Sequence, residues 1–333
     1  MKPIPEQVQS RPLEGLPPPQ QGKVCDLYDL LDYWPGFAFK YITDRISVHD
    51  IVLPFLVFGK GIVLNYIDLF WRRKLGSGVE QDIVAIGQAI DNYLPAHLCG
   101  NPDLHRRGRI VRVHDALAAE LIFRGLLTGS GLKSYRNNNG VICGQQFPAD
   151  LKEWSELTPP AFTPTTKSKD GHDEHMDIKV FLEQFGEEPI KLTRPVYEMG
   201  KKFAAERGII IADTKFEVGR DPQDNALSLI DEVLTPDSSR FLKTEDIEEA
   251  KRTGKRPPSY DKQPIRDYVS EHLGVTADTE LTPKVITKVQ SHRFPGELAA
   301  ETATRYEQLG PMLMGISTRQ FEETLPKLKH TVP

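Results

Sequence analysis

Charged side chains alternate with uncharged ones along the segment IIIADTKFEVG. Because side chains alternate between the two faces of a strand, Asp213, Lys215 and Glu217 are expected to share one face. The run LSLIDEVLTPDSS follows after the turn-like DPQDN, so the two segments are predicted to form a β-hairpin. A lysine and several carboxylates on apolar strands cost free energy unless they serve one another or a ligand.

Two carboxylates of this hairpin have the chemistry of a magnesium site. Glu217 on the first strand and Asp231 on the second could supply oxygen ligands to Mg²⁺, which typically binds through one or two carboxylates plus substrate phosphates. An ordinary hairpin whose charges face water explains the same spacing equally well. The residues alone therefore leave an ATP–metal site and a solvated hairpin open.

A second possible phosphate contact is the step Gly22-Lys23-Val24, a turn with a cation near the start of a strand. By itself this pattern is as typical of a surface turn. The sequence contains neither GxxxxGK[ST] nor GxGxxG, so neither a P-loop fold nor a dinucleotide-binding fold is indicated.

Hydroxyls, glycines and arginines gather in two short segments. Thr128-Gly129-Ser130-Gly131 follows Arg124, and Thr235 to Arg240 reads TPDSSR. Guanidinium and hydroxyl groups together suit a phosphate or carboxylate on a small substrate, although capped turns use the same residue types. The histidines of HDEH at 172–175 lack a rigid scaffold and a third ligand, and no GxSxG motif occurs, so zinc and serine-nucleophile chemistry are not indicated.

Composition limits the class of protein. The net charge of -5 and the pI near 6.0 argue against a general nucleic-acid binder. The three cysteines form no CxxC pair, and no apolar run approaches the ~18 residues that a membrane span needs. We expect a soluble cytoplasmic protein, a monomer or homo-oligomer, with no nucleic-acid or membrane partner.

The chain of 333 residues is long enough for two lobes. We expect a flexible arm over 1–21, a β-rich nucleotide lobe over 22–115 and an α+β lobe over 116–333. Apolar spacing and turn residues predict short strands over 24–57, a helix over 62–74, a strand, connector and strand over 110–123, a long loop over 158–177, a helix over 192–207, a surface loop over 253–260 and helical patches after 282.

Several segments taken in order resemble the SAICAR synthetase (phosphoribosylaminoimidazole-succinocarboxamide synthase) family: GKVCDLYD, TDRISVHD, GKGIVLN, ELIFRGLLTGS, FTPTTK with GHDEH, IIIADTKFEVG and LIDEVLTPDSSRF. The resemblance runs from about Gly22 to about Val269, and ADTKFEVG and DEVLTPDSSR are its most specific parts. It implies an α+β fold of two lobes, similar to the ATP-grasp and kinase arrangement, with ATP in the cleft between them.

The same resemblance implies a carbon–nitrogen ligase of de novo purine biosynthesis. Such an enzyme condenses carboxyaminoimidazole ribotide (CAIR) with L-aspartate through an acyl phosphate, giving SAICAR, ADP and phosphate, with ATP and Mg²⁺ as cofactors. Carried over residue by residue, it assigns ATP contacts to Gly22, Lys23, Glu120 and Lys215, catalytic and metal roles to Lys215, Glu217 and Asp231, and substrate contacts to Ser47, Asp50, Arg124, Ser130, Asp237 and Arg240.

This sequence departs from the family pattern in several places. Cys25 stands where Arg or Lys usually follows GKV, and packing positions differ at Ala118, Leu126, Leu132 and Leu242. The region after Pro283 is longer than the family pattern leads us to expect. A catalytically weakened relative that only binds nucleotide or ribotide is therefore an alternative, as is a kinase-like phosphotransferase, which would lack its HRD and DFG motifs.

Overall fold

The computed structural model describes residues 3–167 and 174–325, and within them helices and sheets are mixed, as expected of an α+β protein. The chain forms two compact units. The first comprises residues 1–69, 82–113 and 262–333, and the second comprises residues 70–81 and 114–261. Helix α1 (Lys60–Leu75) crosses the boundary, and it fulfils the prediction of a helix over 62–74.

The main sheet of the first unit is antiparallel, with its strands in the order β1-β2-β3-β7-β6. These strands are β1 (Gln20–Gln21), β2 (Cys25–Asp29), β3 (Phe37–Ile42), β7 (Gly108–Arg112) and β6 (Ile83–Ile86). Tyr28, Phe39 and Ile110 lie opposite one another on three neighbouring strands and are almost fully buried. The predicted short strands of this region are thus confirmed, and their apolar face forms the core.

The N-terminal segment packs on that core. A 3-10 turn covers Glu6–Val8, and both Val8 and Leu16 are buried. Leu16 joins the cluster that contains Tyr28 and Phe39. The Pro- and Gln-rich composition predicts a flexible arm, whereas two well-placed apolar residues suffice to bury part of it.

A second hairpin of the first unit consists of β4 (Arg45–Val48) and β5 (Ile51–Leu56). His49 and Asp50 both have positive φ values, 49° and 63°, as a two-residue type I′ turn requires.

The C-terminal helices explain why residues 262–333 belong to this unit. Ile265 and Val269 of α7 (Gln263–Leu273) and Val289 of α8 (Pro283–Gln290) share a buried cluster with Ile46 and Val48. The expected lobe over 116–333 assigned these helices elsewhere because sequence order alone does not reveal this packing. The remaining helices of the first unit are α2 (Pro102–Arg107), α9 (Gly296–Met314) and α10 (Thr318–Thr324), with 3-10 turns at Gly87–Asn92 and Ala96–Leu98.

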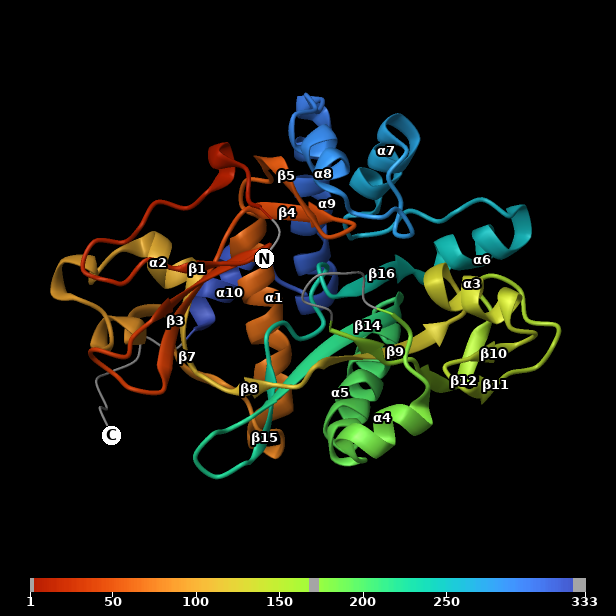
Figure 1. The fold of residues 1–333 in the computed structure, drawn as a ribbon, viewed down its shortest axis with the longest axis horizontal. Coiled ribbons are helices and arrows are strands. Elements are labelled where there is room, and N and C mark those ends of the chain that lie inside the picture. The colour runs from red at the N-terminus through yellow and green to blue at the C-terminus, as the bar shows by residue number, and fades with distance from the viewer. Residues whose placement is uncertain (1–2, 168–173, 326–333) are drawn as a thin grey trace. The chain divides into compact units, whose positions relative to one another are not determined.

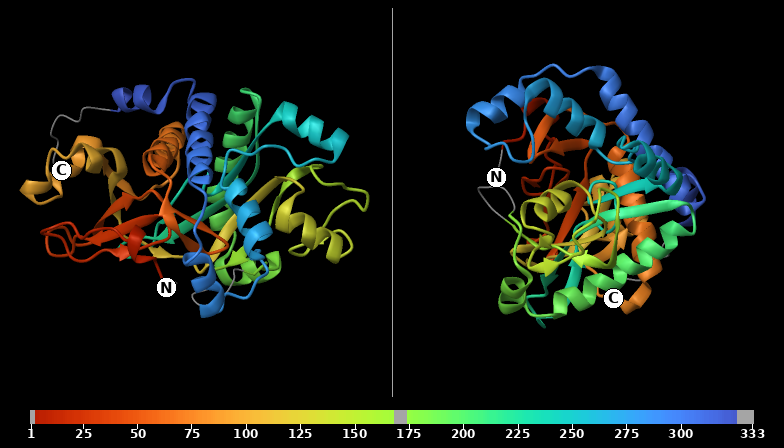
Figure 2. Two further views of the ribbon diagram at one scale, coloured as in Figure 1. Left: turned by 90° about the horizontal axis from the view of Figure 1, so that it is seen from above. Right: turned by 90° about the vertical axis from the view of Figure 1, so that its right-hand side faces the viewer.

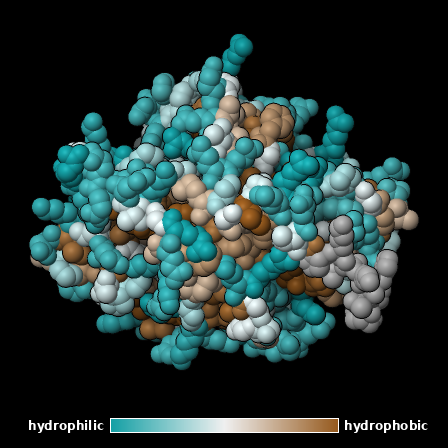
Figure 3. Space-filling view, turned by 180° about the vertical axis from the view of Figure 1, so that it is seen from behind, coloured by the Kyte–Doolittle hydropathy of each residue, from teal (hydrophilic) through white to brown (hydrophobic). Residues whose placement is uncertain are grey.

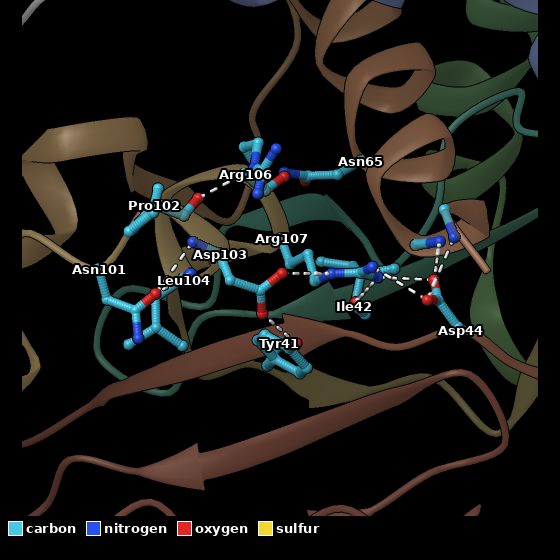
Figure 4. Close-up of polar contacts among 12 residues, drawn as sticks. Tyr41, Ile42, Asp44, Asn65, Asn101, Pro102, Asp103, Leu104, Arg106 and Arg107 are labelled. Carbon is cyan, nitrogen blue, oxygen red and sulfur yellow. Dashed lines mark hydrogen bonds and ion pairs between the residues drawn. The ribbon is translucent and has the colours of Figure 1, made fainter. Parts of the chain in front are cut away.

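An ion-pair network links α2 to the strand ends (Figure 4). The Arg107 guanidinium donates to Asp44 Oδ1 at 2.6 Å and Oδ2 at 3.0 Å, and its Nε donates to Asp103 Oδ1 at 2.9 Å. Tyr41 Oη donates to Asp103 Oδ2 at 2.6 Å. This network fixes the connection between β3 and β4.

The second unit is built on one large sheet with the path β12-β9-β14-β15, to which β13, β16 and β8 add at its sides. Its strands are β8 (Asp115–Ala116), β9 (Ala119–Leu126), β12 (Glu156–Phe162), β13 (Thr165–Thr166), β14 (Ile209–Arg220), β15 (Leu227–Ile230) and β16 (Ser239–Lys243). Around it are α3 (Gly129–Asn137), α4 (Ile178–Phe185), α5 (Glu188–Ala205), α6 (Thr244–Thr253), the short hairpin of β10 (Val141–Ile142) and β11 (Gln145–Gln146), and a 3-10 turn at Gly76–Gly78.

Strand β14 is the central strand of this sheet, and α5 packs along it (Figures 1 and 2). Tyr197 Oη of α5 donates to the backbone oxygen of Ile211 at 2.9 Å. The antiparallel β14–β15 pair confirms the predicted hairpin. The predicted loop over 158–177 is wrong at its start, because β12 extends to Phe162 as an edge strand, where prolines are tolerated.

The surface in Figure 3 is mainly hydrophilic, and apolar side chains appear in separate areas among polar ones. Among the described residues, no helix combines the length and the apolar character that crossing a membrane requires.

Candidate functional site

Strands β9 and β14 bring an ammonium group and two carboxylates together. Lys215 Nζ donates to Glu120 Oε1 at 2.8 Å and to Glu217 Oε1 at 3.1 Å. Lys215 lies opposite Ile122 and Phe216 opposite Leu121, so the strand register places Glu120 across from Glu217. These three residues, with Lys167 and Asp231, are called the acidic cluster below.

Lys167 and Thr165 hold the two glutamates of this cluster in place. Lys167 Nζ forms an ion pair with Glu217 Oε2, and Thr165 Oγ1 donates to Glu120 Oε2 at 3.0 Å. Both residues belong to the FTPTTK segment, which reaches the cluster because β13 pairs with β9. The segment Ser168–Asp173 that follows, including His172 and Asp173 of HDEH, lies outside the described residues.

Asp231 lies immediately after β15 and has a φ of 59°. Its backbone carbonyl accepts a hydrogen bond from Arg72 Nη2 at 2.7 Å, which fixes the backbone there. Its carboxylate is near enough to act electrostatically on both Lys215 and Glu217. The structure thus gathers Glu120, Lys215, Glu217 and Asp231, four residues that the sequence singled out.

Lys215 and Glu217 of the acidic cluster keep their charges near neutral pH. Desolvation lowers the pKa of Lys215, but Glu217, Glu120 and Asp231 outweigh it and leave this pKa well above its usual value. Desolvation and Asp231 raise the pKa of Glu217, whereas Lys215 and Lys167 lower it, and the net shift is downward. The cluster therefore offers ionised oxygens and a permanent cation, the groups that bind a metal–phosphate complex.

A second group on the same sheet is rich in guanidinium and hydroxyl groups. Arg124 Nη1 donates to Asp213 Oδ2 at 3.1 Å, and Arg124 Nη2 donates to Ser130 Oγ at 2.9 Å. Arg240 Nη2 lies 3.8 Å from Asp213 Oδ2, and its Nη1 donates to Thr128 Oγ1 at 3.3 Å. Arg124, Ser130, Asp213 and Arg240 are called the arginine cluster below.

Burial and neighbouring carboxylates act in opposite directions on the pKa values of both arginines. Desolvation lowers the pKa of Arg124, and Asp213 only partly offsets this, while carboxylates including Asp213 and Asp261 raise the pKa of Arg240 against its own desolvation. A Cβ at Gly131 would lie 2.9 Å from Arg124 Cδ, so the glycine leaves room for that side chain. Two guanidinium groups thus lie beside one shared carboxylate, and guanidinium is the side-chain group that best matches phosphate or carboxylate anions.

Asp237, also assigned to substrate binding, lies in the turn that precedes β16. Its backbone N–H donates to Thr235 Oγ1 at 3.3 Å, and Thr235 Oγ1 donates to Glu232. The turn leads directly into Arg240 on β16.

The predicted nucleotide turn lies in the first unit, between β1 and β2. Gly22 N–H donates to the backbone oxygen of Cys25 at 2.7 Å, and a Cβ at Gly22 would come within 2.8 Å of that oxygen, so the turn needs glycine. Lys23 Nζ forms an ion pair with Asp50 Oδ1 from the β4–β5 turn, and Ser47 lies on β4 opposite Val52. Lys23 and Asp50 were assigned to different ligands, yet the structure pairs them.

Sequence reasoning gave no role to several residues that organise these groups. Lys167 is the last residue of the FTPTTK segment, but its contact with Glu217 depends on the β13–β9 pairing. Thr163 Oγ1 accepts from Arg124 Nε at 2.9 Å, and Arg45 contacts the nucleotide turn. No signal in the spacing identifies them, because each contact joins distant parts of the chain.

The chain matches known proteins in sequence. The family model described as SAICAR synthetase matches residues 19–282. A phosphoribosylaminoimidazole-succinocarboxamide synthase of Maridesulfovibrio salexigens is 40% identical over 256 residues, covering 75% of this chain and 82% of the relative. The Saccharomyces cerevisiae enzyme of that name is 36% identical over 314 residues, covering 91% of this chain and 96% of the relative.

Solved structures give the same answer. SAICAR synthase from Saccharomyces cerevisiae, complexed with SAICAR, superposes with a TM-score of 0.76 at 33% identity, covering 93% of this chain and 99% of that chain. A type-2 SAICAR synthetase in complex with ADP, at 16% identity, shares the fold with a TM-score of 0.59 over 90% of this chain and 99% of that chain. Because the two Saccharomyces cerevisiae matches cover 91% and 93% of this chain, they must extend past Pro283. The relatives therefore share at least part of the region after Pro283 that the family pattern did not lead us to expect. The chain belongs to the SAICAR synthetase family.

Proposed function

We propose that this protein uses ATP to condense CAIR with L-aspartate, giving SAICAR, ADP and phosphate. The observation that carries the proposal is that one strand, β14, contributes to both the acidic and the arginine cluster. Asp213 lies in the arginine cluster, and Lys215 and Glu217 lie in the acidic cluster. A substrate anion held by the arginines would therefore lie beside groups that bind a metal–phosphate complex.

The chemistry requires activation of a carboxylate. An ionised carboxylate resists attack by an amine, so the CAIR carboxylate first attacks the γ-phosphorus of ATP and ADP leaves. The aspartate amine then attacks the acyl carbon, phosphate departs, and the amine loses a proton. Lys215 fits a role in stabilising charge on the transferring phosphoryl group, because its neighbours keep it protonated.

Arg124, Ser130 and Arg240 fit the anionic groups of the ribotide, and we place Asp237, Ser47 and Asp50 among the substrate contacts. Gly22 and Lys23 are proposed to contact the nucleotide phosphates, with Glu120 completing the ATP site. Arginine suits the ribotide better than lysine because its planar fork binds phosphate or carboxylate through two bonds.

The donor set of the acidic cluster fits Mg²⁺. Asp231 raises the pKa of Glu217, so the two carboxylates repel one another and would gain from a shared cation. Among the described residues, no group of three or more His, Cys, Asp or Glu side chains could hold a metal alone, so phosphate oxygens would have to complete the shell. Bound there by Glu217 and Asp231, Mg²⁺ would supply charge neutralisation for the phosphates.

The proposal places the protein in the cytoplasm. Cys25, Cys99 and Cys143, all within the described residues, form no disulfide, as is usual in a reducing compartment.

A module that only binds ligands would have no use for the pair of metal-binding carboxylates in the acidic cluster, so the enzyme is the preferred interpretation.

The direct test is ADP release by the purified protein with MgATP, CAIR and L-aspartate, with controls that omit each substrate in turn. We expect release to require all three. Saturable binding of ATP or CAIR without any ADP release would favour the interpretation that the protein only binds these ligands. Release without aspartate would instead indicate a phosphotransferase.

Isotope transfer tests the acyl phosphate. With ¹⁸O in the CAIR carboxylate, one labelled oxygen should appear in the inorganic phosphate, because the bond from carbon to that oxygen breaks when the amine attacks. Unlabelled phosphate would exclude this intermediate while leaving the overall condensation intact.

A further inference from the structure

The guanidinium of Arg45 lies at the base of the predicted nucleotide turn. Its Nη2 donates to the backbone oxygens of Gly22 at 2.9 Å and Cys25 at 3.1 Å. The same guanidinium forms an ion pair with Asp26, and both side chains are fully buried. One arginine thus joins β4 to the turn and to the start of β2.

A third carbonyl of the turn is held by Thr43, two residues before Arg45. The backbone oxygen of Val24 accepts from Thr43 N–H at 2.9 Å and from Thr43 Oγ1 at 2.8 Å. The oxygens of Gly22, Val24 and Cys25 are therefore all hydrogen-bonded to protein donors. Within the part of the chain that the structure describes, the N–H groups of Lys23 and Val24 donate to no protein acceptor.

A turn with three of its four carbonyls engaged and two successive N–H groups available has the features of a concave anion site. Such a site loses affinity when its backbone shifts, since each N–H must aim at a phosphate oxygen. We infer that Arg45 is a positioning residue for ATP: it does not touch the nucleotide but holds the Gly22–Cys25 turn in the conformation that receives the phosphates. This inference rests on the proposed function, because it takes ATP as the ligand.

The residue type matters at this position. Arg45 makes contacts with two backbone oxygens, with Asp26 and with Ser10 Oγ, the last at 2.9 Å from Nη1. A lysine would keep the charge opposite Asp26, but a single ammonium cannot reach acceptors spread along a planar fork. Arg45→Lys therefore preserves the buried charge pair while removing part of the support of the turn.

The Ser10 contact also links the N-terminal segment to the turn. Ser10 lines a cavity of about 390 Å³ whose wall also includes Arg45, Tyr41 on β3, and Asn101 and Arg107 at the two ends of α2. The cavity has polar groups such as Arg45 and Thr43 on its wall and is large enough for water, which can replace a lost hydroxyl. Ser10→Ala should therefore have a much smaller effect than Arg45→Lys.

Arg107 provides a matched control. It is another buried arginine of the first unit with a two-bond carboxylate partner, Asp44, and it also contacts Asp103 and the backbone of Ile42 (Figure 4). These partners all lie outside the Gly22–Cys25 turn. Arg107→Lys should therefore destabilise the fold to a similar degree without altering the turn directly.

The experiment compares Arg45→Lys, Arg107→Lys and Ser10→Ala in the full-length protein. ADP affinity is measured by calorimetry, and KM for ATP and for CAIR is measured in the ADP-release assay. We expect Arg45→Lys to weaken ADP binding and raise KM for ATP on the order of tenfold, with KM for CAIR unchanged. Arg107→Lys should lower thermal stability and leave both nucleotide values near those of the wild type.

Gly22→Ala serves as a second variant should Arg45→Lys fail to fold, because the added Cβ would press on the Cys25 oxygen and shift the same turn. It should show the same selective loss for the nucleotide. Equal ADP affinities in wild type and Arg45→Lys, or an equal loss in Arg45→Lys and Arg107→Lys, would overturn the inference. A wild type that binds ADP without turnover would instead refute the proposed function alone, since the binding comparison still holds.

Discussion

Arg124 and Asp213 lie directly opposite one another on β9 and β14, and Arg124 Nη1 donates to Asp213 Oδ2 at 3.1 Å. The same carboxylate oxygen lies 3.8 Å from Arg240 Nη2 on β16. A central strand thus supplies a carboxylate that is shared by two arginines from its two neighbours. The geometry of the arginine cluster follows from sheet register rather than from loop conformation.

Arg240→Lys tests this cluster. The ammonium cannot bind an anion through two bonds, so KM for CAIR should rise on the order of tenfold or more while KM for ATP stays near the wild-type value. Steady-state kinetics with each substrate varied in turn provides the measurement. Arg252→Lys, an exposed arginine paired with Glu249 on α6, is the control. An unchanged KM for CAIR would remove Arg240 from the site.

Asp231→Asn tests the proposed metal site. Asparagine tolerates a positive φ, and the backbone carbonyl rather than the side chain receives the Arg72 hydrogen bond, so the fold should persist. We expect kcat to fall on the order of 10²-fold or more, with a nearly unchanged melting temperature. Asp224→Asn, an exposed position in the β14–β15 loop, is the control. Normal turnover at saturating Mg²⁺ would refute the metal role.

Cys25→Ala addresses the departure from the family pattern. The turn uses the backbone oxygen of Cys25, which accepts from Gly22 N–H and Arg45 Nη2. Removal of the thiol should therefore leave kcat and KM for ATP within about twofold of the wild type. A large loss of turnover in a folded variant would show that the side chain itself takes part.

The shifted pKa of Glu217 predicts how acid affects stability. Because Lys215 and Lys167 lower this pKa in the folded protein, the charged pair contributes its full stabilisation above the unfolded value of about 4.3. That contribution disappears as the pH falls through the lower folded value. Urea unfolding at neutral and acid pH should show a smaller loss on acidification for Glu217→Gln than for the wild type.

Glu248→Gln is the control for the acid experiment, because Glu248 forms an exposed ion pair with Lys251 on α6. Exposed pairs contribute little, so this variant should follow the wild-type pH dependence. Parallel curves for the wild type and Glu217→Gln would contradict a folded pKa below the ordinary one.

The alternation of Asp213, Lys215 and Glu217 predicts that these side chains share one face of β14, and the turn-like DPQDN predicts the hairpin, because strand periodicity and turns are local properties. Partners from distant segments were not predictable in this way. The ion pair between Lys23 and Asp50 depends on the β4–β5 turn, and the contact of Lys167 with Glu217 depends on the β13–β9 pairing. Residues 262–333 were assigned to the wrong neighbours because helical periodicity shows an apolar face but not what covers it.

The length of β14 is constrained as well as its composition. Its chemical residues alternate with Thr214, Phe216 and Val218, all of which are buried. Loss or gain of a single residue within 213–217 would turn the charged side chains into the core and the apolar ones outward. An insertion or deletion in this stretch would therefore disrupt the core and both clusters at once.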